Sequence, residues 1–151
     1  MKIYYREKSA GIEILRCFGI ESRVEIPGMI DGKLVISAAP YAFSSHMDEK
    51  EDLKNASLWE VSDGLEFGRE EHVLAGNDVE EIVFPYTLKE IGRYIFYGCG
   101  NLKKLEFSDS LMQIGCGAFT GCHALEKLTV HMRQGKKSGV KEMLGEMWQR
   151  I

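Results

Sequence analysis

Four cysteines and four histidines are the residues of this sequence with the most direct capacity for chemistry. Cys116 and Cys122 lie close together, His123 follows Cys122 directly, and His131 lies a little further on. This proximity raises two hypotheses, a zinc site and a Cys–His nucleophile pair. The spacing supports neither, because no CxxC or HxxxH pattern is present and the side chains of adjacent residues point apart. We therefore expect no catalytic residue, no metal ligand and no cofactor.

An internal repeat explains two of these cysteines. The segment from Leu88 aligns with the segment from Leu111 at a constant offset of 23 residues, and Cys99 falls on Cys122. The other matched positions are Leu88, Ile91, Gly92, Phe96, Gly98, Leu102, Leu105 and Phe107 with Leu111, Ile114, Gly115, Phe119, Gly121, Leu125, Leu128 and Val130. Equivalent positions in stacked repeats are neighbours, so a disulfide between Cys99 and Cys122 is conceivable. Reduced, buried thiols that fill small turn positions are the favoured interpretation, and we expect Cys116 to be more exposed.

Each repeat predicts one short strand followed by a return. Leu105 and Phe107 alternate with Lys104 and Glu106, which indicates an apolar side facing inward and a polar side facing out. One offset earlier, Val79, Ile82 and Phe84 occupy the matching positions, so a third strand precedes the two full repeats. Because a single repeat cannot bury its apolar side, neighbouring repeats must stack, with parallel strands about 4.8 Å apart.

An earlier and more degenerate copy covers residues 24–46, in which Phe43 stands for Phe96, Ser45 for Gly98 and His46 for Cys99. The repeat period then leaves residues 47–78 as an insertion. Insertions in repeat arrays often carry the binding face, which makes this segment a functional candidate. The alternative is a decayed repeat whose leucines and Trp59 still fill the core.

The two ends predict caps. Ile12 and Ile14 with Val24 and Ile26 are interpreted as an N-terminal hairpin over the first strand. After a flexible linker, apolar residues at helical spacing predict an amphipathic helix from Ser138 or Gly139 to Ile151. This helix either covers the last repeat or begins a following domain.

The segment Ile114-Gly115-Cys116-Gly117-Ala118-Phe119-Thr120-Gly121-Cys122-His123-Ala124-Leu125-Glu126-Lys127-Leu128-Thr129-Val130 resembles the repeat of the BspA-like leucine-rich-repeat family. The resemblance covers residues 79–131, extends in weaker form to 24–46, and departs at Ile95, where the family prefers Ala. It implies a bacterial protein, an adhesive or protein-binding role, and short parallel strands joined by turns or short helices. The expected fold is a β-rich α/β leucine-rich-repeat solenoid with an N-terminal β cap and a C-terminal amphipathic helix. One domain spans 1–134, with the degenerate repeat 24–46, the insertion 47–78 and the repeats 79–131, and 135–151 forms the linker and helix.

Composition argues against several classes of function. The formal net charge of −4 and the pI near 5.6 do not suit a nucleic-acid-binding protein, which needs clustered basic residues. No apolar run approaches the roughly 20 residues that cross a bilayer, so we expect no membrane insertion. The charged start at residues 1–8 does not indicate a signal peptide. The expected location is cytoplasmic if Met1 is the native start, and otherwise the cell surface is an option.

Two surfaces are candidates for binding a protein partner. Outward strand positions form columns at the repeat offset, and we take Glu81, Lys104, Lys127, Val83, Glu106 and Thr129 as candidates, with Pro85, Ser108 and His131 as a third column. The alternative is that these charges are ordinary cross-strand pairs that keep the face soluble.

The second surface is aromatic. Tyr86, Tyr94 and Tyr97 surround the first full repeat, and the next repeat does not retain them. Tyrosine is common at interface hot spots, although these side chains would equally suit packing against the insertion. The sequence thus favours a non-catalytic protein–protein interaction module or scaffold of a bacterial protein. The alternative is a regulatory or targeting domain of a larger, enzymatic or adhesive protein. Neither the partner nor the oligomeric state is assigned.

Overall fold

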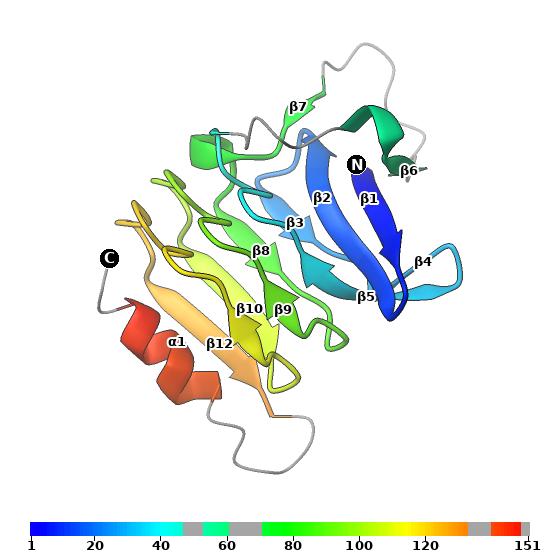
Figure 1. The fold of residues 1–151 in the computed structure, drawn as a ribbon. Coiled ribbons are helices and arrows are strands. Elements are labelled where there is room, and N and C mark those ends of the chain that lie inside the picture. Colours follow the sequence, from blue (N-terminus) through cyan, green and yellow to red (C-terminus); the bar gives the residue numbers. More distant parts are fainter. Residues whose placement is uncertain (47–52, 61–70, 133–139, 149–151) are drawn as a thin grey trace.

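The computed structural model describes residues 1–46, 53–60, 71–132 and 140–148, and Figure 1 shows the fold. These residues form a β-rich solenoid whose coils stack side by side, with one sheet facing another across the core. The N-terminal strands lie at one end of the stack, and the C-terminal helix lies at the other (Figure 1).

One sheet consists of four parallel strands, and we call it the parallel sheet. In spatial order its strands are β12 (Lys127–His131), β10 (Lys104–Ser108), β8 (Glu81–Val83) and β3 (Arg23–Glu25). Leu105 lies opposite Leu128 on one side and Ile82 on the other, which confirms the offset of 23 residues. Val24 lies opposite Ile82, so the degenerate first repeat contributes to the same sheet.

The other sheet contains eight strands of mixed direction. Its strands are β1 (Lys2–Lys8), β2 (Gly11–Gly19), β4 (Met29–Ile30), β5 (Lys33–Ala38), β6 (Ser57–Glu60), β7 (His72–Val73), β9 (Glu90–Ile91) and β11 (Gln113–Ile114). The return strands β5, β9 and β11 run parallel to one another, and β2 joins β5 in the same direction. Strands β1, β4, β6 and β7 pair antiparallel with their neighbours, so this sheet combines the repeat with an N-terminal cap.

The expected N-terminal hairpin was wrong in its strands. Ile12 and Ile14 lie on β2, whose hairpin partner is β1, whereas Val24 lies on β3 in the opposite sheet. Strand β1 was missed because its charged residues obscure its alternation, although Ile3 and Tyr5 are buried. Residues 23–25 instead behave as a repeat strand, since they pair in parallel with β8.

The predicted insertion is described over residues 53–60 and 71–78, while 47–52 and 61–70 lie outside the described residues. It contributes β6 and β7 together with the 3-10 turns η1 (Leu53–Asn55) and η2 (Gly76–Asp78). Trp59 on β6 packs against the core, and β6 pairs antiparallel with β1. The described part of the insertion therefore extends the N-terminal hairpin and adds no parallel repeat strand.

The α/β description also needs correction. In the part of the chain that the structure describes, one α-helix is present, α1 (Val140–Trp148), and the coils return through short strands and turns. Val140 and Leu144 are buried with the hydrophobic core, and α1 lies beside β12 (Figure 1). The predicted linker and the last residues of the predicted helix lie outside the described residues.

Stacked aromatic rings run through the core between the two sheets. The rings of Phe43 and Phe96 have centroids 6.2 Å apart, and those of Phe96 and Phe119 are 5.7 Å apart. Phe84 stacks on Phe107 at 5.0 Å. Equivalent residues of successive coils therefore touch, as the alignment of Phe43 with Phe96 predicts, and this ladder fixes the spacing of the outward side chains.

Candidate protein-binding surfaces

The outward face of the parallel sheet carries the first group of candidate residues. Lys104 and Lys127 are exposed, while Glu81, Glu106 and Thr129 are half-buried. Their register follows from the buried neighbours, because Leu105 and Phe107 point into the core and the residues between them must point outward. The structure therefore places the first predicted column, Glu81, Lys104 and Lys127, in one row across the strands. The second predicted column, Val83, Glu106 and Thr129, forms the next row.

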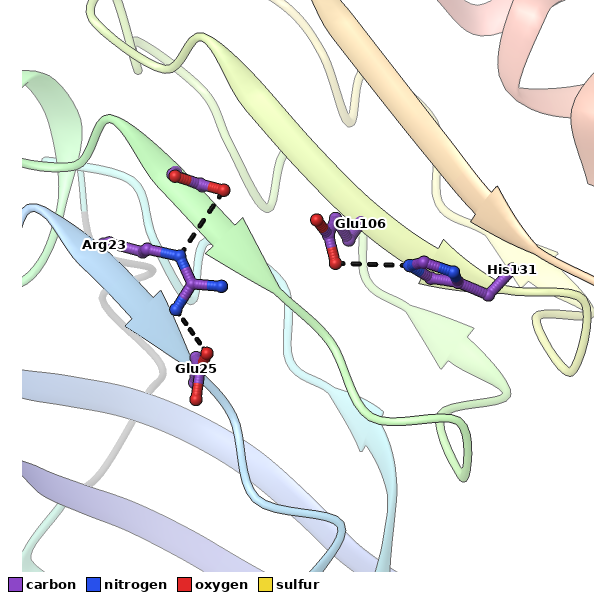
Figure 2. A network of polar contacts seen from close by, with 5 residues as sticks. Arg23, Glu25, Glu106 and His131 are labelled. Atoms are coloured by element: carbon purple, nitrogen blue, oxygen red, sulfur yellow. Dashed lines mark hydrogen bonds and ion pairs between the residues drawn. The ribbon is translucent and has the colours of Figure 1, made fainter.

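Ion pairs link the charged side chains of β3 and β8 on this face. The Nε atom of Arg23 lies 3.5 Å from an Oε1 atom of Glu81, and its guanidinium also donates a hydrogen bond to Glu25. Figure 2 shows Arg23 between these two carboxylates. The hydrogen bond to Glu25 raises the pKa of Arg23 further above its already high value, so this charge is permanent. Sequence analysis did not select Arg23 or Glu25, although alignment of Val24 with Ile82 would have placed them beside Glu81 and Val83.

A second contact links β10 to β12. The Nε2 atom of His131 lies 3.2 Å from an Oε2 atom of Glu106 (Figure 2). The third predicted column was wrong at Ser108, which is only 4% exposed. Its hydroxyl donates to the main-chain oxygen of Tyr86 at 3.3 Å, and a turn at residues 109–110 follows directly after β10. Of the two residues paired at the end of β10 and β12, the outward face therefore exposes His131 and not Ser108.

The two lysines of the outward face, Lys104 and Lys127, are neighbours in the strand register. Lys104 lies directly opposite Lys127 in the parallel ladder. Within the described residues, neither side chain forms a hydrogen bond or an ion pair. Lys103, one residue away, has an Nζ atom 3.9 Å from a carboxylate oxygen of Glu80. The sheet thus presents two ammonium groups side by side without an ion pair, and Glu81, which lies opposite Lys104 on the other side, is engaged by Arg23.

The tyrosines divide between two places. Tyr94 and Tyr97 lie together in the turn between β9 and β10, with ring centroids 5.9 Å apart and an edge-to-face angle of 83°. Tyr86 lies in the turn that follows β8, at the other end of the coil. Tyr41, which sequence analysis missed, stacks on Tyr94 at 5.6 Å with an interplanar angle of 19°. The alignment of Phe43 with Phe96 contained this signal, because it places Tyr41 on Tyr94.

This tyrosine ladder has a structural role. Tyr41, Tyr94 and Gly117 occupy one repeat position, and all three have positive φ, at 60°, 51° and 65°. Such a conformation is unfavourable for a bulky residue, so stacking must offset the strain at both tyrosines. The ring of Tyr94 also covers Gly117, since a Cβ atom there would lie 2.3 Å from Cε1 of Tyr94. Among Tyr41, Tyr94 and Tyr97, only Tyr97 is exposed, with 42% of its surface accessible, so it is the one that a partner can contact most readily.

The thiols are reduced and three of them are buried. Cys99 and Cys122 donate hydrogen bonds to the main-chain oxygens of Phe43 and Phe96, at 3.1 and 3.3 Å. Burial raises the pKa of Cys17, Cys99 and Cys122 to about 12, which keeps these thiols protonated and unreactive near neutral pH. Cys116 is exposed, as predicted, and all four cysteines are free.

The described residues offer neither a cluster of metal ligands nor a helix suited to span a membrane. No group of three His, Cys, Asp or Glu side chains in those residues is arranged to hold a metal ion. In the same residues, no helix has the length and apolar character that crossing a bilayer requires.

Comparison with known proteins gives one family match and one structural match. Residues 70–139 match a family model described as a BspA type leucine rich repeat region (6 copies). The curated proteins contain no match. The chain is similar to the crystal structure of a leucine rich cell surface protein from Faecalibacterium prausnitzii A2-165, with a TM-score of 0.53 and 19% identity. That alignment covers 84% of this chain and 28% of the other, so the likeness concerns the fold of a part of a longer protein.

Proposed function

We propose that this chain, whose residues 70–139 match a family model of a BspA type leucine rich repeat region, is a non-catalytic module that binds a protein partner through the outward face of its parallel sheet. The observation that carries the proposal is the register of β3, β8, β10 and β12, which holds side chains of four coils in fixed rows. Stacked repeats with such rows present an extended and pre-organised surface. Pre-organisation favours binding, because little side-chain or backbone entropy remains to be lost on association.

The chemistry of the described residues supports a binding role over catalysis. Nucleophilic catalysis needs a thiolate or an activated hydroxyl beside a base. Cys17, Cys99 and Cys122 instead have pKa values raised to about 12 by burial. The one histidine on the parallel-sheet face, His131, contacts the carboxylate of Glu106 and no thiol.

Affinity capture with surface variants tests this proposal. The purified chain is used as bait in a lysate and in the medium of the source organism, and captured proteins are identified by mass spectrometry. Val83→Arg with Thr129→Arg places bulk and charge on both sides of Glu106, in the row that these three residues share, and both substituted side chains are half-buried. Gln113→Arg is the matched control, because Gln113 is exposed on β11 of the opposite sheet.

We expect a partner that the wild type and Gln113→Arg both retain and the double variant loses. Unchanged melting temperatures would show that the variants are folded. A partner that binds the double variant as well as the wild type would place the interface elsewhere and contradict the proposal.

The aromatic surface is the second candidate site, and its test needs a different substitution. Tyr94 stacks on Tyr41 and covers Gly117, so its removal would disturb the coils themselves. Tyr97 is exposed, and its side chain contacts Tyr94 through the edge-to-face ring pair. The hydrogen bond from the main-chain nitrogen of Tyr97 to the oxygen of Tyr94 does not depend on the side chain. Loss of a captured partner with Tyr97→Ala, at an unchanged melting temperature, would assign binding to this turn.

A further inference from the structure

Charge is compensated unevenly along the outward face of the parallel sheet. In the β3–β8 half, Arg23 contacts both Glu25 and Glu81, so the one cation of that half has its own counterions. Figure 2 shows this closed group separated along the face from Glu106 and His131. A partner that approached the β3–β8 half would have to break existing ion pairs to make new ones.

The β10–β12 half has the opposite character. Lys104 and Lys127 lie directly opposite each other, both are exposed, and neither has a counterion among the described residues. The carboxylate of Glu106 lies on the same face but is engaged by His131 at 3.2 Å. Like charges placed directly across a ladder are unfavourable, so the folded chain retains a local repulsion here.

We propose that the Lys104–Lys127 pair is the docking point for an acidic segment of the protein partner. This inference rests on the proposed function, since it names the chemistry of the partner for the same face. Adjacent strands are about 4.8 Å apart, which lets carboxylates on one segment contact both ammonium groups. Binding then removes a repulsion as well as adding two attractive pairs.

The other charges of the face favour an acidic protein over a nucleic acid. Glu25, Glu81 and Glu106 lie on the same surface as the two lysines, and the formal net charge of the chain is −4. A continuous phosphate backbone would pass close to these carboxylates and be repelled. A short acidic segment can be confined to the β10–β12 half, where Thr129 provides a neutral neighbour for the lysines.

Nuclear magnetic resonance titration tests the inference without knowledge of the natural partner. The isotope-labelled full chain is titrated with a hexaglutamate peptide at low ionic strength, where surface electrostatics are least screened. Hexalysine and a single-stranded oligonucleotide serve as comparison probes. The test variant is Lys104→Gln with Lys127→Gln.

The matched control is Lys89→Gln with Lys103→Gln. It removes the same charge from two exposed lysines that precede β9 and β10 and lie outside the outward rows of the parallel sheet.

We expect hexaglutamate to shift the amide signals of residues 104–108 and 127–131 and to leave those of residues 23–25 unchanged. The test variant should weaken binding about fivefold, as the loss of two exposed ion pairs implies, and the control variant should not. Equal weakening by both variants, shifts spread over the whole chain, or tighter binding of the oligonucleotide would overturn the inference. Absence of hexaglutamate binding would also overturn it. If affinity capture is still lost with Val83→Arg and Thr129→Arg, the proposed function would stand with a partner of different chemistry.

Discussion

The Sγ atom of Cys122 lies 3.3 Å from the main-chain oxygen of Phe96, to which it donates a hydrogen bond. Cys99 makes the same contact one coil earlier, with the oxygen of Phe43 at 3.1 Å. Each thiol therefore joins its own coil to the aromatic position of the coil before it. This repeated contact explains why the two cysteines share a repeat position without forming a disulfide.

Substitution of Cys122 by Ala should destabilise the chain moderately. The change removes the hydrogen bond and leaves a small void, which together should lower the free energy of unfolding by about 1–2 kcal/mol. The cost stays moderate because the oxygen of Phe96 keeps the hydrogen bond from the main-chain nitrogen of Cys99, at 3.0 Å. Urea unfolding followed by circular dichroism measures the change. Cys116→Ala is the control, and its exposed position should keep its effect within about 0.5 kcal/mol.

The effect of Cys122→Ala should shrink at alkaline pH. Burial raises the pKa of Cys122 from 9.0 to about 12, so between these values the unfolded chain loses a proton that the folded chain keeps. The unfolded state then binds fewer protons, and stability falls as pH rises, by up to about 1.4 kcal/mol per pH unit. Below about pH 8 both states are protonated and the thiol has no pH effect. The free energies of unfolding of the wild type and the variant are measured at pH 8 and at pH 10. The same difference between the two proteins at both pH values would contradict a raised pKa of Cys122.

The repeat offset was enough to predict three strands of the parallel sheet, β8, β10 and β12, but neither β3 nor the N-terminal cap. Register could be read from sequence because Ile82, Leu105 and Leu128 must stack for any one repeat to bury its apolar side. The cap carries no such constraint, since β1 and β2 pair antiparallel and their register includes a bulge between Tyr4 and Tyr5. Periodicity within one strand does not state which distant strand is the partner.

The candidate face was also predicted only in part. The columns of Lys104 and Glu106 follow from alternation with Leu105, and the structure has them in these rows. The ion pairs of Arg23 depend on β3 lying beside β8 across the long insertion, a contact between residues 58 positions apart. The offset of 23 residues does not give this distance, so only a direct alignment of Val24 with Ile82 would have indicated the contact. Burial of Ser108 depends on the local bend after β10, which an offset alone does not describe.

The contact between Tyr94 and Gly117 gives a sharp test of the tyrosine ladder. A Cβ atom on Gly117 would lie 2.3 Å from Cε1 of Tyr94, in addition to the strain of a side chain at φ 65°. Gly32→Ala isolates the second cost, because Gly32 has φ 73° and no atom within 4 Å of a built Cβ. We expect Gly32→Ala to cost about 1 kcal/mol and Gly117→Ala to cost at least about 1 kcal/mol more.

A double-mutant cycle assigns the additional cost to the ring. In the Tyr94→Ala background the steric contact is absent, so Gly117→Ala should cost no more than Gly32→Ala does. The expected coupling between positions 94 and 117 is about 1 kcal/mol, above the limit of additivity for independent sites. Four urea titrations measure it, and additive effects would show that the ring of Tyr94 does not cover Gly117.

The uncompensated lysine pair should oppose stability while serving binding. Replacing Lys127 by Glu turns the repulsion with Lys104 into attraction across the ladder, and Lys127 lies on the last strand of the sheet, so no other strand of the described sheet flanks it. The melting temperature should rise by about 1–2 °C at low ionic strength, and salt should reduce this gain. Lys103→Glu is the contrasting variant, because it breaks the ion pair with Glu80 and should lower the melting temperature slightly. A lower melting temperature for Lys127→Glu would mean that Lys127 already has a counterion in solution. The rise, together with loss of hexaglutamate binding, would show that the face retains a small instability that a partner's carboxylates relieve.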